Sequence, residues 1–206
     1  MPIGDIRQLK TRLRAKYRAI RTEMTAEQRE HCDSRIAERV RRLWQYRRAR
    51  QVLTYVSTPI EVDTRRIIAQ ALADGKRVAV PRCIPDTRQM EFYYISSLDE
   101  LSPGSFGVDE PQPLPENLVT DLSEGLCIIP AFCYDHTGYR LGYGKGYYDR
   151  FLPRFGGNLI GICYSSCVRR HLPHGRFDRP AELLVTENYL RRTDRGIATK
   201  GGTNDG

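Results

Sequence analysis

The chain has 206 residues, of which 40% are hydrophobic and 28% are charged, as in an ordinary globular domain and unlike a disordered chain. No run approaches the roughly 20 apolar residues of a membrane-spanning helix, and the first residues lack the apolar core of a secretory signal. The net charge of +8 favours anionic partners such as phosphates, polycarboxylates or nucleic acid.

Six cysteines are scattered along the chain, and three of them lie in apolar runs. None forms a CxxC pair or stands at metal-ligand spacing from a histidine, which argues against a disulfide framework or a zinc site. A catalytic role for one thiol is a minor alternative. We expect reduced, mostly buried thiols and a cytoplasmic location.

Two helices are predicted at the N-terminus. A stripe of apolar residues spaced three or four apart covers residues 6–24, which is the pattern of a helix with one buried face. Thr25 and Gln28 then match a capping box, in which each side chain bonds the backbone amide of the other residue. The second helix that begins there carries Ile36, Val40 and Leu43 on its inner side.

Strand and helix signals alternate along the rest of the chain. Asp63 or Thr64 is expected to cap a helix that ends before Gly75. The alternation predicts a three-layer α/β domain, an αβα sandwich with a mostly parallel central sheet, over residues 1–192. Residues 193–206 have no apolar periodicity and predict a flexible C-terminal tail. The apolar or alternating runs that predict strands are residues 51–57, 77–83, 89–95, 126–132, 159–164 and 183–186.

The segment RLGYGKGYYD, from Arg140 to Asp149, has the strongest functional signal. Its three alternating glycines follow a buried strand, so the backbone can approach a ligand closely and turn its N–H groups towards an anion. Arg140 and Lys145 add positive charges, and a helix expected near Tyr147 points its positive end at the same place. The segment therefore predicts a binding site for a polyphosphate.

Neither common phosphate-binding fingerprint fits this segment. A Walker A loop needs glycine at 139 and serine or threonine at 146, where the chain has Tyr139 and Gly146, and the dinucleotide pattern fails because its third glycine comes one residue early. Taken alone, the glycines are equally consistent with a structural turn. Asp149 is placed to hold Mg²⁺ beside phosphates, or to complement the dipole of the following helix.

Three further segments each have a functional and a structural interpretation. Lys10 and Arg14 share a helix face and can reach a phosphate chain, although solvated surface charges show the same spacing. Glu61, in the loop after the first strand, has no evident capping role and is free to bind the amino or amide groups of a heterocycle. The alternating run at 90–94 offers a thioether and aromatic wall for a flat ring, or is simply one half-buried strand.

Taken together, these segments resemble the 5-formyltetrahydrofolate cyclo-ligases, also called methenyltetrahydrofolate synthetases. RLGYGKGYYDRFL is similar to the family signature. Three other segments occur in the family's order: KTRLR at 10–14, YVSTPIEVDT at 55–64 and GVDEP at 107–111. The likeness extends over almost the whole chain. It implies a three-layer fold of the NagB/RpiA/CoA-transferase-like kind.

The resemblance implies a role for each matching position. The folate would lie near Val56, Glu61, Tyr143 and Tyr147, and Mg²⁺ would be held by Asp149 and Glu182. The chain departs from the family at two positions, because Glu182 stands where Asp is usual and Phe177 replaces a histidine that often precedes Asp178. ATP would be bound by Lys10, Arg14, Arg140, Leu141, Gly142, Tyr143, Gly144, Lys145, Gly146, Tyr147 and Tyr148.

The implied reaction is the ATP-dependent closure of 5-formyltetrahydrofolate to 5,10-methenyltetrahydrofolate. The formyl oxygen attacks the γ-phosphoryl group of ATP, N10 then attacks the activated carbon, and ADP and phosphate leave. Arg14, Arg140 and Lys145, together with Mg²⁺, would stabilise charge during phosphoryl transfer, so these three are the predicted catalytic residues. We expect a monomer that acts on the two small molecules and has no membrane or nucleic-acid partner.

Two alternatives stay open at this point. Phe177 and Glu182 are consistent with a paralogue that keeps the nucleotide pocket but acts on another substrate or catalyses nothing. The basic N-terminal helices are consistent with a nucleic-acid-binding module, although the sequence has no RNA- or DNA-binding motif to support it.

Overall fold

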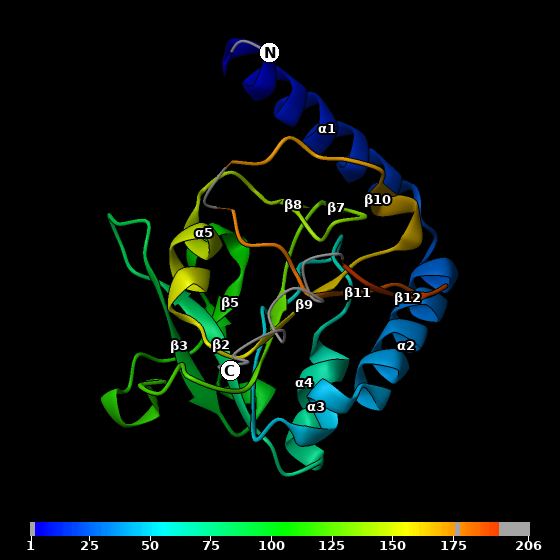
Figure 1. Cartoon of the computed structure of the whole chain (residues 1–206). Helices are drawn as coiled ribbons and strands as arrows, with labels where there is room; N and C mark the ends of the chain where they lie inside the picture. The colour runs from blue at the N-terminus through cyan, green and yellow to red at the C-terminus, as the bar shows by residue number, and fades with distance from the viewer. Residues whose placement is uncertain (1–2, 176–177, 194–206) are drawn as a thin grey trace, which may run out of the picture.

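The computed structural model describes residues 3–175 and 178–193, which fold around a seven-stranded sheet (Figure 1). Its strands are β1 (Gln51–Leu53), β2 (Arg77–Cys83), β3 (Met90–Ile95), β6 (Leu126–Ile129), β9 (Asn158–Ile162), β11 (Leu183–Val185) and β12 (Leu190–Arg192). They are ordered β12-β11-β9-β6-β1-β2-β3. The five inner strands are parallel, and β3 and β12 pair antiparallel at the two edges. The predicted mostly parallel sheet is confirmed.

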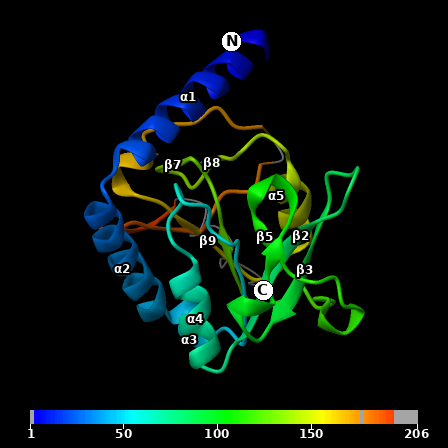
Figure 2. The same cartoon turned by 180° about the vertical axis from the view of Figure 1, so that it is seen from behind.

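Helices cover both faces of this sheet, as Figures 1 and 2 show. On one face lie α2 (Ala26–Arg42), α3 (Trp44–Arg48) and α4 (Arg65–Ala73), and on the other lies the short α5 (Tyr147–Phe151). The long helix α1 (Ile3–Glu23) crosses the top of the molecule in Figure 1. The fold is therefore the predicted three-layer α/β arrangement, although the layer formed by α5 is thin.

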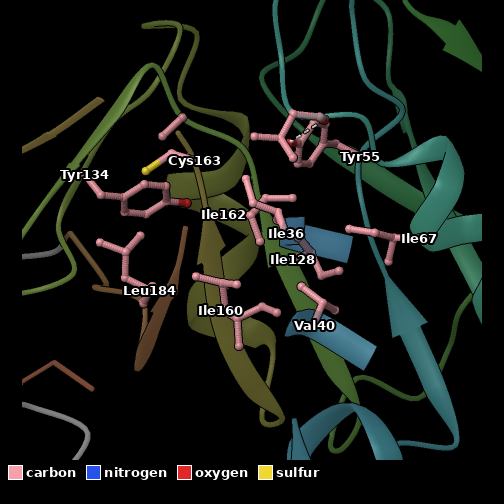
Figure 3. Close-up of a cluster of buried hydrophobic side chains, with 14 of the residues drawn as sticks. Ile36, Val40, Tyr55, Ile67, Ile128, Tyr134, Ile160, Ile162, Cys163 and Leu184 are labelled. Atoms are coloured by element: carbon pink, nitrogen blue, oxygen red, sulfur yellow. Dashed lines mark hydrogen bonds between the residues drawn. The ribbon is translucent and has the colours of Figure 1, made fainter. Parts of the chain in front are cut away.

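Alternation along the strands divides the core into two apolar clusters. Ile128 and Ile160 point towards α2, where Figure 3 shows them opposite Ile36 and Val40. The neighbouring residue Ile129 belongs to the cluster on the other face of the sheet, with the side chains of α5. Successive side chains of a strand point to opposite faces, so a strand buried on both faces reads as a continuous apolar run.

Two smaller sheets flank the central one. β4 (Ser102–Pro103) pairs with β5 (Asp109–Glu110), and β7 (Cys133–Asp135) pairs with both β8 (Arg140–Leu141) and β10 (Val168–Arg169). Short 3₁₀ helices connect several elements. They are η1 (Leu98–Glu100), η2 (Ser105–Gly107), η3 (Pro115–Asn117), η4 (Leu152–Arg154) and η5 (Ser165–Cys167).

Several strands end earlier than the sequence predicts. The run 51–57 forms a strand only to Leu53, and the run 126–132 only to Ile129. The reason is the same in both cases, because the apolar residues that follow leave the sheet. Tyr55 and Val56 instead line a cavity, and Phe132 packs under it. An apolar run in the sequence indicates that its residues are buried, but it does not say whether they are buried in the sheet. These residues are buried outside it.

The predicted helix caps are present. Thr25 Oγ1 accepts from the amide of Gln28 at 3.1 Å, and Gln28 Oε1 accepts from the amide of Thr25 at 3.0 Å, so the capping box is complete. At α4 the capping carboxylate is that of Asp63, which accepts from the amide of Arg65 at 2.9 Å. The hydroxyl of Thr64 instead donates to the Tyr55 carbonyl at 2.6 Å, which fixes the start of the loop after β1.

The ends of the described chain bear on two expectations. Thr193, the first residue of the expected tail, is buried, and its Oγ1 donates to the Ala181 carbonyl at 2.7 Å. Residues 194–206 of that tail, and Phe177, lie outside the described residues. Within the part that the structure describes, no helix has the length and apolarity needed to cross a bilayer.

Candidate active site

A cavity of about 430 Å³ opens at the carboxyl ends of the parallel strands. Its wall includes side chains of α1, the loop after β1, the end of β2, the segment 105–110 and the glycine-rich segment 140–149, together with Met90, Pro130 and Asp178. Ligands of open α/β sheets bind at this edge, where the loops that follow neighbouring strands converge. Every residue predicted to bind ATP or folate lines this cavity, and so does Asp149.

Two of the three glycines in the glycine-rich turn have the positive φ that the sequence predicts. Gly144 and Gly146 have φ of +88° and +78°, in the left-handed region that side chains with a Cβ rarely adopt. At Gly142 no atom lies within 4 Å of the place where a Cβ would stand, so the turn faces open space there. The helix that follows has only five residues, and its dipole adds less than the sequence led us to expect.

Arg14 of α1 lies along this turn. Its Nε donates to the Gly142 carbonyl at 2.9 Å, and a Cβ at Gly144 would stand 3.1 Å from its Nη2. Lys10, one helical turn earlier, also lines the cavity. The close packing against Gly144 explains why the turn needs a glycine beside α1, and it favours the functional interpretation of this pair over that of free surface charges.

Arg140 and Lys145 add two more cations to the same wall. The Arg140 side chain is almost fully buried, its Nη1 donates to the Arg179 carbonyl at 2.9 Å, and its Nη2 forms an ion pair with Asp149. Lys145 Nζ lies 5.1 Å from the centre of the Phe106 ring, within range of a cation–π interaction. Together with Arg14 and Lys10 they give the cavity a strongly positive side.

Glu61 has a structural role that sequence reasoning missed. Its Oε2 accepts from the backbone amide and the hydroxyl of Thr58, at 2.8 and 2.9 Å, and its Oε1 accepts from the hydroxyl of Tyr143. The carboxylate thus closes the loop after β1 and ties it to the glycine-rich turn. Burial, followed by the charge of Glu61, raises the pKa of Tyr143 well above its usual range.

Aromatic and apolar side chains, some of them from the same glycine-rich segment, also line the cavity. Tyr143 packs on Phe132 with ring centroids 4.3 Å apart, and Tyr147 lies 6.1 Å from Phe106 in an edge-on arrangement. Of the run 90–94, Met90 lines the cavity, whereas Phe92 packs against Phe151 in the core. The interpretation of this run as a half-buried strand therefore holds for all but its first residue.

The acidic residues allow a test of the expected metal site. Asp149 and Asp178 present carboxylate oxygens to the cavity, the ligand type that Mg²⁺ prefers, and Mg²⁺ commonly takes only one or two protein carboxylates beside substrate phosphates. No cluster of three His, Cys, Asp or Glu suited to a metal exists among the described residues. Glu182 is half-buried and is not part of the cavity wall, so its role as second ligand stays a prediction.

Some cavity residues were not singled out from the sequence. Phe106 and Glu110 flank or belong to the segment GVDEP, which matched only as part of a family pattern. Asp178 was noted only as the neighbour of Phe177. A charged residue such as Glu110 is seldom buried unless it is bonded, but the sequence around it gives no sign that it is buried.

The fold and this cavity define the class: an α/β protein whose ligand pocket lies at the carboxyl ends of its parallel strands and is lined by basic and aromatic side chains. The sequence model of the 5-formyltetrahydrofolate cyclo-ligase family matches residues 6–187. The chain belongs to the 5-formyltetrahydrofolate cyclo-ligase family, a family of ligases.

Individual relatives agree with this assignment. The 5-formyltetrahydrofolate cyclo-ligase of Saccharomyces cerevisiae is 30% identical over 73% of this chain and 82% of its own length. That of Haemophilus influenzae is 26% identical over 86% of this chain and 98% of its own length. The solved structure of 5,10-methenyltetrahydrofolate synthetase from Aquifex aeolicus is 29% identical, superposes with a TM-score of 0.75, and covers 96% of this chain and 97% of that one.

Proposed function

We propose that the chain catalyses the ATP-dependent cyclisation of 5-formyltetrahydrofolate to 5,10-methenyltetrahydrofolate, with release of ADP and phosphate. One observation carries the proposal: the basic glycine-rich turn and the loop of Glu61 line the same cavity and are joined by the bond from Tyr143 to Glu61. A triphosphate on the turn and a reduced pteridine at the loop would therefore be neighbours, as the transfer of a phosphoryl group between them requires.

In the proposed reaction the phosphate chain of ATP lies against the turn and its cations. Arg14 and Lys145 are free to approach the phosphates, and Lys10 extends the same positive wall. Phosphoryl transfer depends mainly on positioning and on positive charge around the spreading negative charge. The formyl oxygen attacks the γ-phosphorus, the bond from that phosphorus to the bridging oxygen breaks, and ADP leaves.

Arg140 and Asp149 are paired with each other in the absence of ligands. In the proposed complex, Asp149 would help to hold Mg²⁺, with Glu182 as the predicted second ligand, and the metal would supply positive charge to the phosphate oxygens. Release from Asp149 would let Arg140 direct Nη2 towards the phosphates, while its Nη1 stays anchored on the Arg179 carbonyl.

The folate would lie between Val56, Glu61, Tyr143 and Tyr147. The pteridine carries amino and amide N–H groups that suit a carboxylate, and its flat ring suits the tyrosines. After phosphorylation, N10 attacks the activated carbon within the same molecule, so holding N10 in attack geometry supplies much of the rate enhancement.

The proposed enzyme acts as a cytoplasmic monomer on two small molecules, without a nucleic-acid or membrane partner. All six cysteines are free thiols, and four of them are buried, as suits a reducing compartment. The single domain proposed over residues 1–192 supplies every residue of the cavity.

Purified protein mixed with 5-formyltetrahydrofolate, ATP and Mg²⁺ tests the proposal through the absorbance of the methenyl product. The product should form only when ATP is present, with one ADP released per ring closed. Folded protein that binds ATP but makes no product would indicate the paralogue with another substrate. Binding to nucleic acid that weakens steeply with salt, without product, would indicate the nucleic-acid-binding alternative.

A further inference from the structure

The proposed ring closure leaves one proton without an acceptor. N10 of the substrate carries a hydrogen before it attacks the activated carbon, and N10 of the methenyl product carries none. The groups assigned to phosphoryl transfer, Arg14, Arg140 and Lys145, are cations and cannot take this proton. A general base near N10 would accelerate the step, because proton transfer by a positioned side chain commonly contributes about 10²- to 10⁴-fold.

Four acidic side chains among the described residues line the cavity; two of them are held by protein donors, and a third lies beside Arg140. Both oxygens of Glu61 accept hydrogen bonds from protein donors. Asp149 is paired with Arg140. The carboxylate of Asp178 accepts from the Gly175 amide at 2.8 Å, and the residue lies near Arg140, which donates to the carbonyl of the next residue, Arg179. The fourth is Glu110.

One oxygen of Glu110 accepts a backbone hydrogen bond, and the other takes part in a longer ion pair. Its Oε1 accepts from the backbone amide of Cys83 at 3.2 Å. Its Oε2 lies 3.9 Å from Nη1 of Arg82, too far for a hydrogen bond, and that Nη1 donates to the Pro111 carbonyl at 2.8 Å instead. The guanidinium thus lies beside Oε2 without donating a hydrogen bond to it, so Oε2 keeps the capacity to accept from a ligand.

The hairpin of β4 and β5 is built to place this carboxylate. Glu110 is only 4% exposed although it lines the cavity. A Cβ at Gly104, on the facing arm of the hairpin, would stand 2.5 Å from Cγ of Glu110, so the glycine makes room for the side chain. A carboxylate that lines a cavity at this depth, with spare capacity to accept a hydrogen bond, is well placed to bind an N–H donor of a ligand.

The proposed placement of the folate brings N10 towards Glu110. Cys83 and its partner Met90, which pair across β2 and β3, lie beside Glu110 in the wall, and Tyr147 and Phe106 complete it. The benzoyl ring bonded to N10 is flat and apolar and suits this aromatic end, while the pteridine lies at Glu61. N10, which joins the two ring systems, then falls next to Glu110.

On these grounds, and resting on the proposed function, we propose that Glu110 is a catalytic residue that accepts the N10 proton during ring closure. Oε2 first accepts a hydrogen bond from N10–H, which aims the nitrogen lone pair at the activated carbon. The bond from N10 to carbon forms, the bond from carbon to the phosphate oxygen breaks, and inorganic phosphate leaves. The N10 proton passes to Glu110 and then to solvent.

Single-turnover kinetics with Glu110→Gln tests this proposal, because ADP formation reports phosphoryl transfer and methenyl absorbance reports ring closure. Glutamine keeps the shape and can still accept from the Cys83 amide, but it cannot take a proton. We expect ADP formation within about twofold of wild type and ring closure slowed at least about 100-fold.

Asp109→Asn is the matched control. Asp109 is the neighbour of Glu110 in β5 and forms an ion pair with Arg65, outside the cavity. The Asp109→Asn variant should leave the rates of ADP formation and of ring closure unchanged. Equal slowing of both steps by Glu110→Gln would mean a structural role, and unchanged ring closure would mean that the departing phosphate takes the proton. Either result overturns the proposal.

Two further arms remove the remaining ambiguities. If Glu110→Gln does not fold, Glu110→Asp takes its place, because aspartate keeps the base but sets it one methylene further from N10. Slower ring closure with unchanged ADP formation then supports the proposal, and any other pattern contradicts it. Wild-type protein that forms no methenyl product refutes the proposed function itself, which separates that failure from the failure of Glu110 as base.

Discussion

The hydroxyl of Tyr143 donates a hydrogen bond to the carboxylate of Glu61, although 82 residues separate them in the chain. This bond joins the glycine-rich turn to the loop after β1, so a ligand that moves one segment moves the other. The same carboxylate also holds Thr58. Glu61 is therefore a point at which the two predicted binding regions become one site.

Glu61→Gln should weaken folate binding more than nucleotide binding. Hydrogen bonds to a charged group contribute about 1.5–3 kcal/mol, which corresponds to a roughly 10- to 100-fold rise in KM for the folate. Tyr143→Phe removes only the bond between the two segments and should have a smaller effect. Steady-state kinetics with each substrate varied in turn would show this, and an equal rise in both KM values would contradict it.

Lys145→Ala should nearly abolish turnover and leave the fold intact. Lys145 is exposed, lines the cavity and lies over the Phe106 ring, so its loss removes charge without opening the core. Removal of one stabilising group from a transition state commonly costs about 10²- to 10³-fold in kcat. Lys16→Ala, an exposed lysine of α1 outside the cavity, is the control. An unchanged kcat would remove Lys145 from the mechanism.

Arg14→Lys should raise the KM for ATP, although the charge is kept. Lysine lacks the Nε that donates to Gly142 and the flat fork that lies against Gly144. Arg12→Lys changes an exposed arginine of the same helix and should have no effect. Isothermal titration of each variant with a non-hydrolysed ATP analogue would compare them, and equal affinities would contradict a role for Arg14 in the site.

Gly144→Ala and Gly142→Ala should separate strain from steric exclusion. Alanine at 144 is forced to φ of +88° and against Arg14, so we expect a lower melting temperature, equivalent to about 1 kcal/mol or more. Alanine at 142 meets open space and should leave stability unchanged, but its methyl group would enter the space proposed for phosphates. Thermal unfolding with and without ATP tests both, and a loss of stability in Gly142→Ala would contradict the second.

Asp33→Asn should change how stability depends on pH. Burial raises the pKa of Asp33 from 3.8 to about 6, and Tyr164, whose hydroxyl lies 2.9 Å from Asp33 Oδ1, reduces that rise only in part. The folded state therefore binds the proton more tightly, and stability falls as pH rises from 3.8 to about 6. The charge of Arg29 lowers the pKa of Asp33, whereas the charge of Asp63 raises it.

The asparagine variant has no carboxyl to titrate at this position. As the pH rises through that interval, the unfolding free energy of the variant should therefore increase relative to that of the wild type. Chemical denaturation at several pH values measures it, and groups that titrate elsewhere cancel in the difference. Parallel pH profiles of the two proteins would contradict the raised pKa.

Much of the fold follows from the sequence because burial and local capping dominate it. The capping box of Thr25 and the apolar run that contains Ile128 each have a short-range cause that a sequence displays directly. The residue at which a strand ends is harder to predict from the sequence. Tyr55 and Val56 continue an apolar run past Leu53, and only the arrangement of the neighbouring loops decides that they line a cavity.

The site divides in the same way. Gly144 and Lys145 stand in a local pattern whose chemistry is visible, whereas Glu61 and Glu110 gain their roles from partners far along the chain. Spacing along α1 could not tell whether Arg14 faces solvent or a ligand. Its bond to Gly142 spans 128 residues and exists only in the folded protein.

The strand β12 at one margin of the sheet has only three residues, and two of them are Arg191 and Arg192. An open margin of a sheet invites another chain to add a strand, and natural proteins discourage this with brief strands and charged side chains. Leu190, Arg191 and Arg192 are all exposed. If two such molecules paired through their β12 strands, four guanidinium groups would lie close together. Their repulsion opposes the edge-to-edge pairing of sheets that leads to fibres.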